Sequence, residues 1–545
     1  MIDETKDIYT AITFAPVQGF IEKSRKLRDL YGASELLSYL SKKIIDAAKE
    51  IPGVEEVISP GSPNIEQGTP NRILLKGNFP EKQVRDTILL AWKQVIDHCK
   101  QWLNDNLRHL GPYYWDDDWN RWANHSWEIF WAQADSPTSV MRELENNKLA
   151  RDWMAINWIG ESSSLTGTDG IAFPGLGGIE RNPMNISYRD EKEKIEEFYT
   201  ELAKITESTT TPEVEGKFID PKEKLSIPEL TKRLVTHPDI AKRFGMSSLT
   251  KGFQEIQRKP EPETNTPGQW TGWFMGDGDK VGKHLQTIAE TQGDIGLKLF
   301  SEAMRNWGHD FTDNFTNNVP KIRGRVIYAG GDDFLGVIYS PKPEKPEYRI
   351  PAFTAYEWLM TLNERWEQHQ QPITLSVGFV WVAGSVPQRD VLQHCREAEK
   401  LAKSLGRDRI TIRVLFNSGQ YVQWTCPWNY LHILKKYQDR NGNTYEKWES
   451  SGRNEKYKPN WNHIYSDLSQ LKARHAIDLN IDVKSQGGKV NDIYDIAIAL
   501  FNIYFDQGDF LTMNALHIVN NDSSLEIVSW INDLINVGWK LCTDI

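Results

Sequence analysis

The chain has 545 residues, more than one hydrophobic core usually supports, so we expect about two to four domains. Apolar residues make up 39% and charged residues 26%, which is typical of a globular protein and not of a disordered one. The net charge of -11 argues against a protein that coats nucleic acid through its own electrostatics, because phosphate neutralisation needs clustered Lys and Arg. We therefore expect partners to present any nucleic acid that it meets.

The cysteines and the N-terminus indicate a reducing compartment. The four cysteines lie far apart and form no CxxC pair, which argues against a zinc ribbon and against a disulfide framework. The first ten residues are acidic and lack the basic and apolar regions of a signal peptide, and no run approaches the roughly 18 apolar residues of a membrane span. We expect a cytoplasmic protein without a membrane partner.

The first part of the chain is typical of an α+β unit. The pattern predicts a strand over Tyr9–Phe14, a helix over Gln18–Glu50 and a second strand over Asn71–Lys76. Three segments dense in Pro, Thr, Glu and Lys are predicted linkers: Thr206–Lys224, Arg258–Gln269 and Ser340–Arg349.

Residues 84–158 have a helical pattern that is rich in tryptophan. Trp115, Trp119 and Trp122 recur at the spacing of one helix face. Such a stripe could stack bases or bind a partner, but we favour packing, because aromatic stripes at helical spacing usually face a core. Asp116–Asp118 are interpreted as a solvated helix start and not as a metal site, since consecutive helical residues point in different directions.

From Trp270 the chain follows the order β-α-β-β-α-β, the ferredoxin-like order on which Palm domains are built. The predicted strands are Trp270–Gly276, Arg325–Ala329, Phe334–Tyr339 and Ile373–Trp381, with helices over Val281–Phe315 and Ala352–His369. A further helix, Arg389–Leu405, and a strand, Ile410–Leu415, are predicted to follow. From Cys426 onward we expect only helices and loops.

The strongest local signal is a GGDD string set between two β-rich runs. Gly330 and Gly331 would allow the positive φ of a tight hairpin and let a phosphate chain approach the backbone. Asp332 and Asp333 at its tip would repel each other unless cations lay between them. A solvated acidic hairpin that occurs by chance is the alternative.

A strand-terminal DGD motif makes that alternative weak. In a ferredoxin-like sheet its Asp277 would face the same pocket, and three carboxylates suit two Mg²⁺ or Mn²⁺ ions with substrate phosphates as further ligands. Gly278 would add a backbone carbonyl. Lys403 and Arg407 could reach a triphosphate. By themselves both are more typical of surface charges, but together with the acidic hairpin we favour phosphate binding for Lys403. Lys280 and Lys283 are weaker candidates of the same kind.

Several motifs together resemble the large Palm-domain subunit of type III CRISPR-associated effector complexes, in its Cmr form more than its Csm form. The N-terminal motifs are Ala15–Ile21, Ser24–Leu30, Ser34–Ser38 and Pro70–Arg72. The later motifs are Ser162–Gly167, Glu223–Ser226, Lys232–Arg233, Phe244–Ser248, DGD, GGDD, Ser376–Gly378, Ala402–Lys403 and Gly406–Arg409. The resemblance covers most of the chain.

The resemblance implies an α+β fold with two ferredoxin-like Palm domains and with intervening and C-terminal helical domains. We divide the chain into a non-catalytic first Palm (1–83) that later segments could complete, a helical inter-Palm region (84–269), a catalytic second Palm (270–420) and a C-terminal helical domain (421–545). Many relatives carry zinc-binding cysteines between the Palms, whereas this chain has Ser162–Ser164 and Ser226 there, so we expect no zinc. The chain starts at the first Palm, so we expect no histidine-aspartate nuclease domain.

The resemblance also implies conversion of ATP to cyclic oligoadenylates when the complex binds target RNA, with Asp277, Asp332 and Asp333 as metal ligands. Ser376 is placed near the base by its strand alone. The expected partners are backbone, guide-tag-binding and small helical subunits, with guide crRNA and target RNA reached through the complex. Two alternatives are a catalytically silent ATP-binding scaffold and a stand-alone dinucleotide cyclase.

Overall fold

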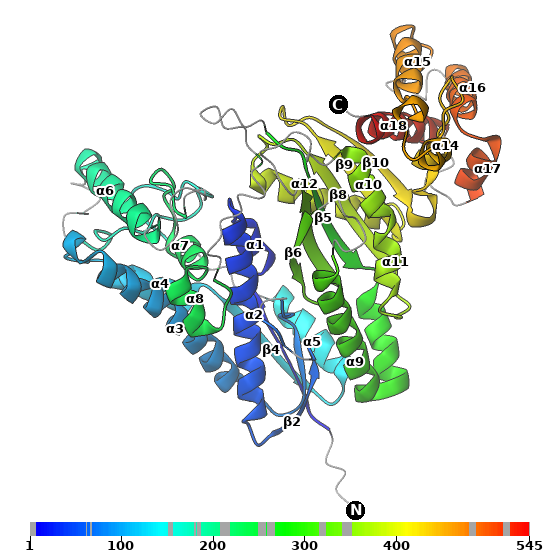
Figure 1. Cartoon of the computed structure of the whole chain (residues 1–545). Coiled ribbons are helices and arrows are strands. Elements are labelled where there is room, and N and C mark those ends of the chain that lie inside the picture. Colours follow the sequence, from blue (N-terminus) through cyan, green and yellow to red (C-terminus); the bar gives the residue numbers. More distant parts are fainter. Residues whose placement is uncertain are drawn as a thin grey trace, which may run out of the picture. The chain divides into compact units, whose positions relative to one another are not determined.

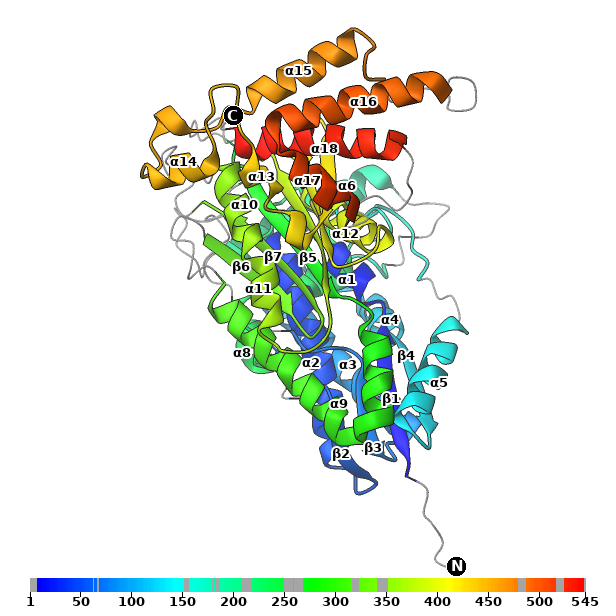
Figure 2. The same ribbon diagram turned by 90° about the vertical axis from the view of Figure 1, so that its right-hand side faces the viewer.

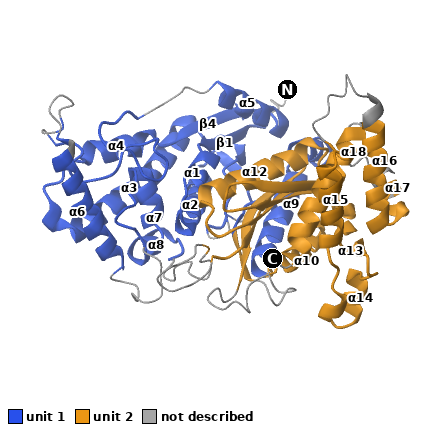
Figure 3. Ribbon diagram, turned by 90° about the horizontal axis from the view of Figure 1, so that it is seen from above, with its two compact units in different colours: residues 1–255, 282–313, 327–331 blue, residues 256–281, 314–326, 332–545 orange. Residues whose placement is uncertain are grey.

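The computed structural model describes the chain in thirteen stretches that form two compact units. The described residues are 7–61, 63–65, 68–150, 156–178, 181, 187–207, 218–248, 258, 268–315, 323–340, 351–478, 487–515 and 524–543. One unit comprises residues 1–255, 282–313 and 327–331, and the other comprises 256–281, 314–326 and 332–545 (Figure 3). The predicted linkers fall largely outside the described residues.

The first unit contains a four-stranded antiparallel sheet. Its strands are β1 (Tyr9–Ala15), β2 (Val54–Ser59), β3 (Ile73–Gly77) and β4 (Glu128–Ala134), in the order β2-β3-β1-β4. Helices α2 (Leu27–Lys49) and α3 (Glu81–Asn106) connect them, and they pack against each other. This β-α-β-β-α-β order is ferredoxin-like (Figure 1). The predicted strands correspond to β1 and β3, whereas β2 and β4 were not predicted.

The predicted helix over Gln18–Glu50 is wrong because the chain breaks into two helices. A short α1 (Gln18–Glu22) ends before α2 begins at Leu27. The Asp29 carboxylate accepts the backbone amides of Arg25 and Lys26, both at 2.9 Å, and so stabilises a second helix start inside the predicted run. Lys232 donates to the carbonyl of Phe20 at 2.9 Å and satisfies the end of α1.

The tryptophan stripe packs into the core of the first unit, as predicted. Trp115 and Trp119 are fully buried at the start of α4 (Asp116–His125), and Trp122 packs against the same core. Asp116–Asp118 form the first turn of α4, as expected of a helix start. The remaining helices of this unit are α5 (Pro137–Leu149), α6 (Tyr188–Glu207), α7 (Ile227–Leu234), α8 (Pro238–Phe244) and α9 (Val281–Asp313), which belongs to it from Gly282 on.

The second unit is built on a six-stranded sheet in the order β10-β9-β8-β5-β7-β6. The strands of this sheet are β5 (Thr271–Gly278), β6 (Arg323–Ala329), β7 (Asp333–Tyr339), β8 (Leu375–Val382), β9 (Arg409–Leu415) and β10 (Tyr421–Pro427), and β6 belongs to the second unit only as far as Val326. The order β8-β5-β7-β6 is the predicted ferredoxin-like core, which β9 extends in parallel to β8. Helices α10 (Ala352–Met360), α11 (Leu362–Glu367) and α12 (Gln388–Ser404) accompany this sheet. The unpredicted β10 extends past Cys426, so the expectation of only helices and loops beyond that residue fails at its start.

The C-terminal segment is helical, as predicted. It contains α13 (Ile433–Lys436), α14 (Tyr445–Ser450), α15 (Asn462–Ala473), α16 (Gly487–Tyr504), α17 (Gln507–Ala515) and α18 (Ser524–Cys542). Helices α15 and α16 both pack on α18 (Figure 2). The indole of Trp530 in α18 donates to the Thr425 carbonyl of β10 at 2.8 Å, which joins the helices to the sheet edge. In the described part of the chain no helix is long and apolar enough to cross a membrane.

Candidate active site

The register of the second sheet places acidic and polar residues in one row across neighbouring strands. Asp277 at the end of β5 pairs with Asp333 of β7 on one side and with Ser376 of β8 on the other. Directly opposed residues in antiparallel strands lie on the same face of the sheet. Asp332 directly precedes β7, and its carbonyl accepts the Gly278 amide at 2.8 Å. The DGD and GGDD motifs therefore meet at the end of this strand pair.

The glycines of the DGD motif provide space for this meeting. A Cβ added at Gly276 would lie 2.2 Å from the Phe334 ring of β7. A Cβ at Gly278 would lie 2.9 Å from Val281 and 3.2 Å from the Asp332 side chain. Glycine at both positions allows β5 and the start of β7 to approach closely, which sets the distance between Asp277 and the two aspartates after the turn.

Negative charge accumulates at the tip of β7. Crowding by surrounding protein atoms, followed by the charges of Asp332 and Asp277, raises the pKa of Asp333 to about 7. The Asp333 side chain nevertheless remains accessible to solvent, so a cation can reach it. Neutralisation by a cation would relieve the repulsion between these carboxylates.

A lysine from α12 already supplies one positive charge. The Lys403 ammonium lies 2.5 Å from an Asp277 carboxylate oxygen and 2.5 Å from Glu399, one helical turn earlier in α12. Burial alone would lower the pKa of Lys403, but its hydrogen bonds to Asp277 and Glu399 raise it above the ordinary lysine value. Lys403 is therefore charged, and it contacts a predicted metal ligand.

The chemistry of these donors fits divalent magnesium or manganese, although the described residues contain no group of three or more His, Cys, Asp or Glu that could hold a metal ion by itself. The donors are hard carboxylate oxygens, and Mg²⁺ is usually bound by one or two carboxylates together with substrate phosphates. Asp277, Asp332 and Asp333 therefore suit ions that arrive with a nucleotide better than a closed protein cage.

The geometry bears on two further sequence predictions. Gly330 and Gly331 were expected to have positive φ, but neither is among the positive-φ residues, so this prediction is wrong. Ser376 was placed near the base, yet its side chain is fully buried and its hydroxyl donates to Asp279 at 2.7 Å. The hydroxyl is therefore already engaged as a donor, and its place near a base stays a prediction.

Arg407 stands in a turn directly after α12. The φ of Gly406, Arg407 and Asp408 is 128°, 65° and 49°, so all three residues adopt a left-handed conformation. The Arg407 side chain is 45% exposed, and its Nε lies 4.0 Å from Asp279. The guanidinium is therefore free to bind a further anion.

Sequence reasoning missed two acidic residues of the site. Asp279 lies two residues beyond Asp277 and is 5% exposed, and Glu399 lies four residues before Lys403. Both spacings could have been recognised in the sequence. Residues two apart lie on the same face of a strand, and residues four apart lie on the same face of a helix.

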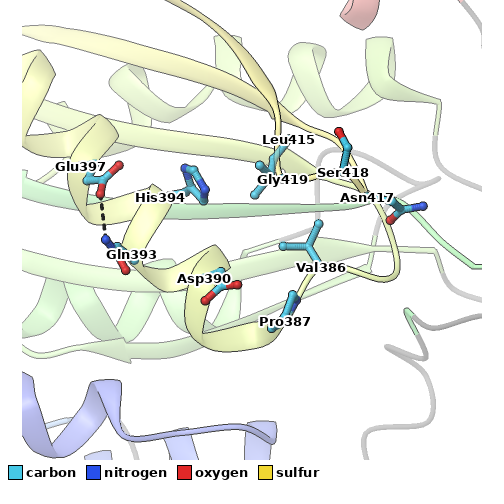
Figure 4. A pocket seen from close by; sticks show the side chains of 10 residues that line it. All are labelled: Val386, Pro387, Asp390, Gln393, His394, Glu397, Leu415, Asn417, Ser418 and Gly419. Atoms are coloured by element: carbon cyan, nitrogen blue, oxygen red, sulfur yellow. Dashed lines mark hydrogen bonds between the residues drawn. The ribbon is translucent and has the colours of Figure 1, made fainter. Parts of the chain in front are cut away.

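A cavity of about 420 Å³ lies elsewhere on the same domain, between the first half of α12 and the β9–β10 turn (Figure 4). Its polar lining includes Asp390, Gln393 and Glu397 along one face of α12. None of the predicted site residues lines it.

Two family descriptions match the chain. The description "Cas10/Cmr2, second palm domain" matches residues 271–411, which contain the row of carboxylates, Ser376, Lys403 and Arg407. The description "CRISPR-associated protein Cmr2, N-terminal" matches residues 9–109 of the first sheet. The chain is a Cas10/Cmr2 large subunit. Among curated proteins, none matches this Cas10/Cmr2 chain.

The comparison with solved structures found similar chains at low sequence identity, of which the first named here has a TM-score above 0.5. A type III-B Cmr-beta structure in the apo state has 11% identity and a TM-score of 0.52, covering 90% of this chain and 77% of that one. A Csm1–Csm4 cassette in complex with one ATP has 13% identity and a TM-score of 0.46, covering 99% of this chain and 70% of that one. Csm1 of T. onnurineus has 13% identity and a TM-score of 0.46, covering 98% and 69%.

Proposed function

We propose that the second Palm is a nucleotidyltransferase that converts ATP to cyclic oligoadenylates when the assembled complex binds target RNA. One observation carries the proposal: the register sets Asp277 beside Asp333 on paired strands, with Asp332 immediately before β7. Acidic side chains so close together, with the pKa of Asp333 raised by burial and by its acidic neighbours, suit the binding of cations, and of phosphate through those cations, better than a structural role.

Each residue has a defined part in this proposal. Asp277, Asp332 and Asp333 would hold two Mg²⁺ or Mn²⁺ ions, and these ions would supply activation of the attacking hydroxyl and neutralisation of the leaving pyrophosphate. Lys403 moves from Asp277 to the triphosphate, and Arg407 binds the same phosphates from its exposed turn. Gly278 and the Gly330–Gly331 backbone leave room for the phosphate chain.

In the transfer step, the 3′-hydroxyl oxygen of one ATP forms a bond to the α-phosphorus of another. The bond between the α-phosphorus and the bridging oxygen breaks, pyrophosphate leaves and the hydroxyl proton passes to solvent. Repetition followed by closure gives a ring. Catalysis rests on positioning and charge stabilisation, as in other phosphoryl transfers. The choice of adenine comes from the family resemblance, since no side chain of the row recognises a base.

Partners and compartment follow from the family. Type III complexes contain backbone, guide-tag-binding and small helical subunits with a guide crRNA, and the net charge of -11 agrees with RNA that is held by other subunits. We place the complex in the cytoplasm and propose that this subunit needs no zinc.

The test is incubation of the assembled complex with ATP and Mn²⁺, with and without target RNA, followed by mass spectrometry. Wild type is compared with Asp332→Ala/Asp333→Ala and with the matched control Asp390→Asn, which removes a carboxylate outside the row. We expect cyclic adenylates only with target RNA and only from wild type and the control.

Other outcomes favour the alternatives. Bound ATP without product from any variant would indicate a scaffold subunit. Product from the isolated chain without RNA would indicate a stand-alone cyclase. Equal product from wild type and the double variant would remove the acidic row from the mechanism.

A further inference from the structure

We propose that Asp279 is a positioning residue that holds the Gly406–Asp408 turn, and through it Arg407, in place for the nucleotide. The inference rests on the proposed function. Asp279 is the second aspartate of the DGD motif, but its side chain is only 2% exposed, compared with 37% for Asp277. The two aspartates of one motif therefore have different environments.

Hydrogen bonds engage both carboxylate oxygens of Asp279. Oδ1 accepts the Ser376 hydroxyl at 2.7 Å, and Oδ2 accepts the Thr374 hydroxyl at 2.9 Å. Oδ2 also accepts the backbone amide of Asp408 at 2.9 Å, and the Arg407 guanidinium approaches Oδ1 at 4.0 Å. A carboxylate has about four acceptor positions. With three accepted hydrogen bonds and a nearby guanidinium, little capacity remains for a metal ion.

The turn that Asp279 contacts needs such support. Arg407 and Asp408 are non-glycine residues with positive φ, a conformation that L-residues rarely adopt and that persists only where surrounding contacts impose it. The Arg407 amide donates to the Ala402 carbonyl at the end of α12, and the Asp408 amide donates to Asp279. These two bonds define the turn from both ends.

The base of this support is the β8 strand. The Asp279 amide donates to the Thr374 carbonyl at 2.8 Å, while the Thr374 and Ser376 hydroxyls return hydrogen bonds to the Asp279 carboxylate. Asp279 thereby links the end of β5, the start of β8 and the turn after α12. Arg407 remains 45% exposed above this link, which is the geometry of a residue held ready for an anion.

The experiment compares Asp279→Asn, Arg407→Ala and their double variant in the full chain, with Asp390→Asn as the matched control. An asparagine side chain has the same shape as aspartate, but an amide NH₂ replaces one of the two acceptor oxygens. The hydrogen bonds that this oxygen accepts in wild type are therefore lost. We expect amide exchange in the segment 406–409 to accelerate at least about tenfold in Asp279→Asn. We expect each single variant to weaken binding of a non-hydrolysable ATP analogue about tenfold, and the double variant to be no weaker than either.

The metal readout separates positioning from ligation. The Mn²⁺ concentration for half-maximal analogue binding should be unchanged in Asp279→Asn. Multiplying effects in the double variant, unchanged exchange at 406–409 or a raised Mn²⁺ requirement would each overturn the proposal. If Asp279→Asn does not fold, Thr374→Val removes one donor, keeps the carboxylate and should show a smaller effect of the same kind. Wild type that binds no analogue would refute the proposed function, and exchange at 406–409 would then decide alone whether Asp279 holds the turn.

Discussion

The buried Arg233 provides a stability prediction that can be worked from the structure. Its guanidinium is fully buried and forms two bonds to Asp29, at 2.8 and 2.9 Å, and one to Glu223 at 2.7 Å. Arg233→Met would leave two carboxylates without this partner. Removing one member of a buried ion pair costs about 3–5 kcal/mol. We expect the lower end, because Asp29 also accepts two backbone amides and Glu223 keeps Lys26 at 2.8 Å.

The assay is thermal unfolding of the full chain at neutral pH. A loss of about 3 kcal/mol corresponds to a fall of roughly 6–12 °C in the melting temperature of a unit of this size. The matched control is Arg85→Met, which breaks an exposed helix pair with Glu81 and should cost under about 0.5 kcal/mol. A loss below about 1 kcal/mol for Arg233→Met would refute the reasoning.

The pH dependence of this loss has a definite sign. Burial alone would raise the pKa of Asp29, but the charge and hydrogen bonds of Arg233 hold it well below its usual range. Because the folded pKa is depressed, wild type keeps this stabilisation above about pH 4 and loses it as the pH falls further. Without Arg233, Asp29 would take up a proton while folded. The cost of Arg233→Met should therefore shrink between about pH 7 and pH 4, and a cost that grows on acidification would contradict this account.

Three further predictions concern the site and the metal content. Lys403→Ala should weaken ATP-analogue binding about tenfold while leaving the Mn²⁺ requirement equal or lower, because a cation that competes for Asp277 is gone; a higher requirement would count against this role. Ser376→Ala should lower affinity for ATP and GTP analogues equally if its hydroxyl only supports the carboxylate network, whereas a selective loss for ATP would support its predicted place near the base. Ser163 lies in the segment where many relatives carry zinc-binding cysteines, and its hydroxyl donates to Glu229 at 2.5 Å. Removal of metal by EDTA should therefore leave the melting temperature unchanged, and elemental analysis that finds stoichiometric zinc would refute the no-zinc prediction.

The second sheet was more predictable from sequence than the first, for a physical reason. Its strands β5, β7 and β8 are buried along nearly their whole length and contain continuous apolar runs, which stand out against the flanking turns. By contrast, β2 is largely half-exposed, and β4 lies directly after a tryptophan-rich helix whose period obscures the change to a strand. Both missed strands of the first sheet depend on pairing with distant segments, which no local window contains.

The carboxylate row was predictable for a different reason. Two motifs at strand ends imply proximity once the ferredoxin-like order is assumed, so Asp277 and Asp333 follow from topology. The hydrogen-bond partner of Ser376 does not follow from topology, because that partner is Asp279, which lies just beyond the end of β5. The GGDD glycines show the same limit, since sequence indicates that a turn is present but not that its glycines avoid positive φ.

Lys403 connects the charge of the site with the step that would start catalysis. Its contact with Asp277 neutralises a carboxylate that otherwise faces Asp333 across paired strands. Glu399 accepts the same ammonium, so the lysine keeps a partner on α12 if Asp277 turns to a metal ion. A nucleotide that arrives with divalent ions would bring both the cations that replace Lys403 and the phosphates that can receive it. Metal and triphosphate binding should therefore be mutually dependent, and binding of Mn²⁺ that is equally tight with and without nucleotide would exclude this exchange.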